Sequence, residues 1–214
     1  MESLQDQDKL LLLVEKYCNL RSPPVLHLKG LGEPGRPSAP SLYKQSKKVV
    51  IAQTLFLDIE SDSLDRSGSV KKAQNVPRQL AKIADSAPIV EQNLQTQDEI
   101  IQRLVKLMIT LGDDINVKLK QNPALQQQLQ NLNYNLFEKL TCTVQNLVVP
   151  PDQAACPDGL VQKQRIAWAF EVTSRLSSVT VVQRRAIQQF GARYIAENHA
   201  GWVQQQGGWE EAFD

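Results

Sequence analysis

Apolar side chains recur at helical spacing through most of the second half of the chain. Between Gln97 and Phe213 they follow one another at steps of three and four residues, the period of an amphipathic α-helix. Asn122-Pro123 and the stretch 149–159, which holds three more prolines, interrupt this spacing. The pattern predicts a helix before Asn122, a second over about 125–147, a third over about 166–176 and a fourth over about 179–194. We expect a bend at 198–201 and then two short helices.

The third of these helices is apolar on every side at its centre. Ile166, Trp168 and Phe170 alternate there with alanine, and Val172 and Leu176 continue the apolar surface. Helices of this kind are buried in the middle of a bundle. The chain is therefore predicted to be all-α, a helical bundle around a central buried hydrophobic helix.

The N-terminal part of the chain has a different pattern. Residues 6–20 are strongly apolar and predict one short helix, assigned to residues 1–21, that docks on the bundle. Residues 22–96 are Pro/Gly-rich and then polar without a sustained period, and we expect a flexible, partly disordered region. The apolar island 49–59 within it favours a strand or a short docked helix. Residues 97–214 form the predicted core.

One stripe in the first core helix has an additional feature. It consists of Leu104, Met108, Leu111 and Ile115, at steps of four, three and four. Gly112 and Asp113 follow the third apolar residue directly. A glycine inside a helix costs about 1 kcal/mol relative to alanine, so its presence needs a reason. Close approach of a partner surface to the helix backbone is one such reason.

This arrangement resembles the third homology motif, or death motif, of the Bcl-2 family of apoptosis regulators. The resemblance implies a helix that lies in the hydrophobic groove of a prosurvival relative, with Asp113 paired to a groove arginine. For the free chain, the stripe can equally be the buried face of a core helix. The two interpretations are compatible if the helix is packed at rest and exposed on activation. Asp113 lies off the stripe and also fits a solvated carboxylate.

A second stretch resembles the second homology motif of the same family. Trp202, Gly207, Gly208 and Trp209 define a short helix, a Gly-Gly turn and a final helix led by tryptophan. The glycines permit positive φ angles in the turn, and the tryptophans are expected to pack both short helices on the bundle. The first homology motif is degraded. Relatives have Asn-Trp-Gly-Arg where this chain has Gln-Lys-Gln-Arg, so only Arg165 remains as a candidate groove arginine or as a solvated basic residue.

Together these motifs imply a regulator of apoptosis, predicted to be pro-apoptotic and to act by protein–protein interaction. A membrane-permeabilising effector of the same family and a non-apoptotic scaffold with the Bcl fold are the alternatives. Residues 59–63, Ile-Glu-Ser-Asp-Ser, resemble sites that initiator caspases cut after an aspartate, here Asp62, although a plain loop explains them as well.

Composition narrows the class of function. The net charge of +1 gives no electrostatic basis for nucleic-acid binding. Three cysteines at unpatterned spacing fit reduced thiols, although a Cys142–Cys156 bridge stays open. With His27 and His199 the only histidines, we expect no metal site, no cofactor and no enzyme activity.

The sequence also predicts where the protein resides. We expect no signal peptide, and the sequence has no apolar run of about 18 residues, which predicts a cytoplasmic protein without stable membrane insertion. Many family members carry a hydrophobic tail anchor after the second homology motif, and from this sequence we expect none here. Contact with mitochondria or other membranes is therefore expected only through a partner, a modification or a conformational change.

Overall fold

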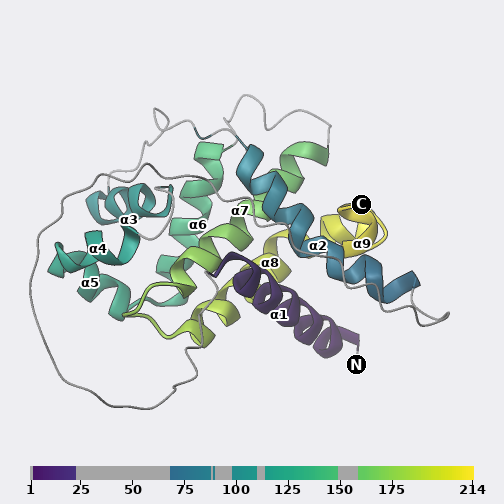
Figure 1. The fold of residues 1–214 in the computed structure, drawn as a ribbon, viewed down its shortest axis with the longest axis horizontal. Coiled ribbons are helices and arrows are strands. Elements are labelled where there is room, and N and C mark those ends of the chain that lie inside the picture. The colour runs from purple at the N-terminus through teal and green to yellow at the C-terminus, as the bar shows by residue number, and fades with distance from the viewer. Residues whose placement is uncertain (1, 23–67, 88, 90–97, 110–113, 149–158) are drawn as a thin grey trace, which may run out of the picture. The chain divides into compact units, whose positions relative to one another are not determined.

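The computed structural model describes residues 2–22, 68–87, 89, 98–109, 114–148 and 159–214, which form an all-α bundle (Figure 1). These residues hold nine helices and no strand. The helices are α1 Glu2–Arg21, α2 Gly68–Ser86, α3 Glu99–Ile109, α4 Asp114–Lys120, α5 Pro123–Gln130, α6 Tyr134–Val148, α7 Gly159–Ser177, α8 Arg184–Gln205 and α9 Trp209–Ala212. The predicted fold class is confirmed.

Helix α7 is the central buried helix that the sequence predicts. It packs against α1, α2, α6 and α8, and every residue from 166 to 174 is buried. Trp168 and Phe170 are 2% and 0% exposed. Because burying a side chain of this size contributes about 1.5–3 kcal/mol, the apolar centre of α7 accounts for much of the stability of the bundle.

Helix α8 lies close against α7. A Cβ atom on Gly191 of α8 would be 2.4 Å from Oγ1 and 2.5 Å from Cγ2 of Thr173 on α7. The Thr173 hydroxyl is held in place because it donates to the carbonyl of Ala169 at 2.7 Å. Glycine at position 191 therefore sets how closely α7 and α8 approach.

The predicted N-terminal helix is present as α1, and it packs against α7 and α8. Leu10, Val14, Tyr17 and Cys18 form its buried face. Cys18 and Cys142 carry free thiols, and burial raises the pKa of the Cys18 thiol.

The prediction of a flexible region is wrong for residues 68–86, which form helix α2. Val76, Leu80 and Ala84 share one buried face of this helix, which packs against α1, α7 and α9. The segment is polar on average and has Pro77 inside the helix. Polar segments with a proline are usually not helical, because proline disfavours helix interiors. The amphipathic helix was therefore missed in the sequence.

The prediction of a single core helix over about 125–147 is also wrong, because the chain forms two helices there. α5 ends at Gln130 and α6 begins at Tyr134. Between them Asn133 caps α6, since its side-chain oxygen accepts from the backbone N–H of Leu136 at 2.9 Å. The leucine spacing runs through this break and gave no sign of it.

The bend expected at 198–201 does not occur. α8 continues through these residues to Gln205, and a Cβ on Gly201 would meet no atom within 4 Å. His199 and Val203, four residues apart, are both buried on the same side of α8. The chain turns only at the Gly-Gly pair that follows.

Some predictions concern residues outside the described ranges. They are the apolar island 49–59, the cleavage position Asp62, the motif positions Leu111, Gly112 and Asp113, and Cys156.

Candidate functional site

The predicted death motif starts in α3 and continues into α4. Leu104 and Met108 of α3 are 0% exposed, and Ile115 of α4 is 4% exposed. α3 packs mainly against α6, and it also contacts α4, α5 and α7. In the free chain the described part of the stripe is therefore core. The structure does not describe the motif as one continuous helix, because α3 ends at Ile109 and α4 begins at Asp114.

Two side chains connect the death-motif segment to α7 and to the turn that follows it. Arg175 of α7 donates through Nη1 to the backbone carbonyl of Met108, near the end of α3. Asn116 of α4 bridges the turn after α7, donating to the carbonyl of Ser178 at 3.2 Å and accepting from the N–H of Thr180 at 3.0 Å. The segment is thus attached by hydrogen bonds on both sides of the Gly-Asp positions.

Glu171 is a buried carboxylate in the middle of the central helix. It is 5% exposed, and its two oxygens accept from three donors. Nε of Arg175 lies 2.6 Å from Oε1, and Nε of Arg21 lies 2.9 Å from Oε2. The Tyr17 hydroxyl donates to Oε2 at 2.7 Å. Burial and the Glu171 charge raise the pKa of Tyr17 well above its ordinary value, so the phenol keeps the proton that it donates.

The sequence analysis did not identify this charged cluster. Its members are Tyr17 and Arg21 of α1, Asp85 of α2, and Glu171 and Arg175 of α7. A charged pair four residues apart inside the central buried helix was the available signal in the sequence. The cluster connects α1, α2 and α7, and through Arg175 it reaches the end of α3.

The predicted Gly-Gly turn is present between α8 and α9. Gly207 and Gly208 have φ angles of 92° and 109°, which glycine adopts most readily. The N–H of Gly208 donates to the carbonyl of Val203 at 2.9 Å and so closes the end of α8.

Both tryptophans of this second motif contact aromatic rings. The Trp209 ring makes an edge contact with Phe170 of α7 at 5.8 Å between centroids, and it stacks on Phe213 at 5.9 Å. The Trp202 ring lies 6.4 Å from the same Phe213 ring. These aromatic contacts fix the last short helix against the central one.

Arg165 lies in a polar network at the other end of α7. Its backbone carbonyl accepts from the amide nitrogen of Gln145 at 2.7 Å, and its side-chain Nε is buried with no hydrogen-bond partner in the described residues. The Gln145 amide nitrogen also lies 3.1 Å from Nε2 of His199, and its oxygen accepts from Tyr194 at 2.7 Å. The structure therefore places Arg165 beside His199, and not beside the described part of the death motif.

Comparison with known proteins identifies related chains. Human apoptosis facilitator Bcl-2-like protein 14 is 30% identical over 116 residues, which is 54% of this chain and 35% of the relative. The bovine protein of the same name is 28% identical over 116 residues. The mouse protein is 24% identical over 162 residues, or 75% of this chain and 48% of its own length. The chain is similar to these Bcl-2-like proteins over about half of its length or more. No family model and no solved structure matches it.

These relatives are longer than the chain, which spans between about a third and a half of their length. Their name contains the word apoptosis, in agreement with the family that the two motifs indicated. The degraded first homology motif remains the main departure of this chain from the motif pattern of the Bcl-2 family.

Two further properties of the described residues bear on function. None of the described helices has both the length and the apolar character needed to cross a membrane. In the same residues, no three His, Cys, Asp or Glu side chains lie together as a metal site would require.

His199, which was expected in a turn, is buried on α8 and is neutral. Burial lowers its pKa to about 4, and the charge of Arg165 acts in the same direction. Both ring nitrogens face amide nitrogens: that of Gln145 lies 3.1 Å from Nε2 and that of Gln162 lies 2.9 Å from Nδ1. An imidazolium would need an acceptor at both nitrogens, which Gln145 does not offer.

Stability is therefore expected to fall as the pH is lowered from about 6.5 to about 4. The unfolded chain protonates His199 near pH 6.5, whereas the folded protein does so only near 4, so between these values the unfolded state binds more protons. The loss amounts to about 3 kcal/mol at most. Urea unfolding at pH 7 and pH 4.5 measures it for the wild type and His199→Gln. If both proteins lose the same stability, His199 is not the titrating group.

Proposed function

We propose that the protein regulates apoptosis by donating its death-motif helix to the hydrophobic groove of a prosurvival Bcl-2 relative. The observation that carries the proposal is the stripe of Leu104, Met108 and Ile115, which is apolar, regularly spaced and at most 4% exposed. The name of its relatives, apoptosis facilitator, supports the pro-apoptotic direction. The protein would act from the cytoplasm and reach mitochondria through its partner.

Donation requires the segment to leave its own core. Each buried anchor contributes about 1.5–3 kcal/mol of transfer free energy, and a partner groove has to replace this burial. The contacts from Arg175 and Asn116 also have to break. The apparent affinity of the full chain is then the affinity of the open form multiplied by its population, so the closed chain is expected to bind more weakly than an isolated peptide.

The test is binding of a peptide spanning residues 98–120 to purified prosurvival Bcl-2 proteins. Leu111→Glu places a charge on the stripe and is expected to weaken binding about 100-fold, as for a central interface anchor. Val117→Glu is the matched control, because Val117 is 53% exposed in the free chain and lies off the stripe. Equal affinity of the wild-type and Leu111→Glu peptides would contradict the proposal.

A further inference from the structure

Helices α1, α2 and α9 surround a cavity at the surface of the bundle. α2 packs against both α1 and α9, and the cavity lies where the three helices meet. Its volume is about 210 Å³. Four apolar side chains line it, namely Leu12 and Leu13 of α1, Val76 of α2 and Trp209 of α9. The described part of the death-motif segment contributes no lining residue, so this cavity is separate from the site described above.

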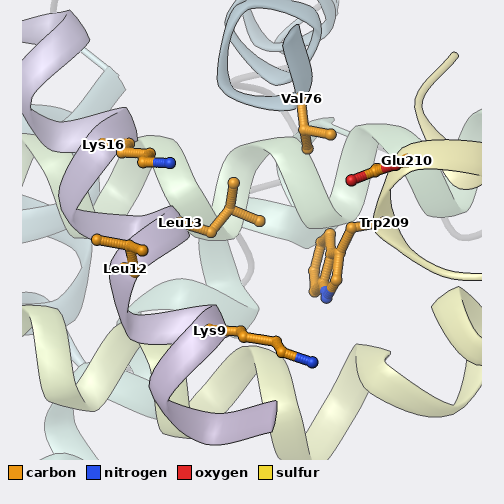
Figure 2. Close-up of a pocket in the computed structure, with 7 residues that line it drawn as sticks. All are labelled: Lys9, Leu12, Leu13, Lys16, Val76, Trp209 and Glu210. Atoms are coloured by element: carbon orange, nitrogen blue, oxygen red, sulfur yellow. The ribbon is translucent and has the colours of Figure 1, made fainter. Parts of the chain in front are cut away.

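The walls of the cavity are held in place by contacts elsewhere in the bundle. Figure 2 shows Val76 and Trp209 facing α1 across the space. The Trp209 ring is fixed by its edge contact with Phe170 of α7 and by its stacking on another aromatic ring of the C-terminus. The ion pair between Arg21 and Asp85, at 2.6 Å, joins α1 to α2. The cavity is therefore formed before a ligand arrives, which lowers the ordering cost of binding.

The charged residues of the lining are divided between two sides of the cavity. Lys9 and Lys16 belong to α1, whereas Glu210 belongs to α9 (Figure 2). The two lysines are seven residues apart and so share one face of α1. The acids beside them in the sequence, Asp8 and Glu15, lie about 100° around the helix. An anionic group in the cavity is therefore attracted to the α1 side and repelled from the α9 side.

The volume of the cavity limits the size of its ligand. An apolar protein cavity of about 150 Å³ holds one benzene molecule, which has six carbon atoms. In proportion, a cavity of about 210 Å³ holds an aliphatic chain of about eight carbon atoms. A terminal acidic group then remains at the rim, where the lysines lie. A phospholipid with two long chains does not fit into this space.

We propose that this cavity binds one free medium-chain fatty acid, an aliphatic carboxylate of about eight to ten carbon atoms. The chain lies between Leu13, Val76 and Trp209, and the carboxylate pairs with Lys16 and Lys9 at the α1 rim. The bound molecule contacts α1, α2 and α9 together and so stabilises their packing. The proposal involves neither the death-motif segment nor a partner protein, and it is independent of the proposed function.

The probe is 10-bromodecanoate, titrated into the full chain and followed by tryptophan fluorescence, which bromine quenches at short range. Of the three tryptophans, Trp209 lines the cavity, whereas Trp168 is only 2% exposed. We expect saturable quenching, most of which is lost in Trp209→Phe although calorimetry still detects decanoate binding to that variant. Quenching of the same depth in Trp209→Phe, or no saturable quenching of the natively helical wild-type chain, overturns the proposal.

Charge reversal at the rim tests the position of the carboxylate. Lys16→Glu replaces an attraction by a repulsion and is expected to weaken decanoate binding about tenfold, and Lys9→Glu added to it weakens binding further. Lys82→Glu is the matched control, because Lys82 is an exposed lysine of α2 that does not line the cavity. It should bind decanoate like the wild type. Equal weakening by Lys82→Glu and Lys16→Glu would show that only net charge matters, which overturns the proposed position.

Chain length distinguishes a cavity from a lipid-binding surface. In calorimetry below the micelle concentration, affinity should rise by up to about fourfold per methylene from hexanoate to octanoate. Beyond about ten carbon atoms it should level off, because the cavity is full. Affinity that keeps rising up to tetradecanoate overturns the proposal. Sedimentation with vesicles of anionic phospholipid tests the other source of acyl chains. Vesicle binding that Lys16→Glu abolishes, in a chain that binds no decanoate, would make this face a membrane surface and also overturn the proposal.

Discussion

Glu171→Ala is expected to lower the free energy of unfolding by about 3–5 kcal/mol, the usual cost of removing one partner from a buried ion pair. The substitution leaves Arg21 and Arg175 without their shared acceptor, and their side chains are only 25% and 12% exposed. It also removes the acceptor of the buried Tyr17 hydroxyl. Urea unfolding at neutral pH, followed by circular dichroism, measures the change.

Glu197→Ala is the matched control for this loss. Glu197 also pairs with an arginine four residues away, Arg193, and also accepts from a tyrosine, Tyr134. However, its side chain is 47% exposed, and exposed pairs contribute about 1 kcal/mol or less. A Glu171→Ala chain that loses no more stability than Glu197→Ala would show that the charged cluster does not hold the helices together.

Arg175→Ala is expected to strengthen binding of the full chain to a prosurvival partner by about tenfold. Arg175 donates to the carbonyl of Met108, so its removal weakens the attachment of α3 to α7. A hydrogen bond from a charged group contributes about 1.5–3 kcal/mol, and 1.4 kcal/mol corresponds to a tenfold change in binding. Affinity measured by calorimetry should rise even though the free energy of unfolding falls.

The control for this prediction is Arg193→Ala. Like Arg175, Arg193 pairs with a glutamate four residues away. Both guanidinium groups also lie over an aromatic ring, that of Arg193 at 4.0 Å from the centre of the Tyr134 ring and that of Arg175 at 5.2 Å from the centre of the Trp168 ring. Arg193 has no contact with α3 in the described residues, so its removal should leave partner affinity unchanged. Unchanged affinity for Arg175→Ala, with the peptide still binding tightly, would mean that opening of α3 does not limit binding.

The fold was predictable where burial produces a periodic pattern. The centre of α7 is apolar on all sides because the bundle surrounds it, and the Gly-Gly turn is visible because few residues other than glycine adopt its φ angles. Helix α2 was not predictable from average composition, since only one face of it is apolar and that face includes small alanines. The break before α6 depends on one capping residue, Asn133, within a leucine pattern that continues across it.

The candidate site was predictable only in its apolar part. The spacing of Leu104, Met108 and Ile115 identified three buried positions. The side chains that attach the segment come from distant parts of the chain, since Arg175 is 67 residues from Met108 and Tyr17 is 154 residues from Glu171. Such contacts depend on how helices pack and have no local pattern. The same holds for Asp85 and Arg21, whose pairing becomes visible only once α2 lies beside α1.

Hydrogen exchange of the full chain, alone and with a prosurvival partner, tests the central claim most directly. If α3 leaves its core to enter a partner groove, the face of α6 beneath it should exchange faster in the complex. The amides of residues 99–109 should become more protected by the partner. The account predicts both changes together, larger in Arg175→Ala than in Arg193→Ala at equal partner concentration. Tight binding with unchanged exchange in α3 and α6 would contradict it, because the partner would then bind another surface of the closed bundle.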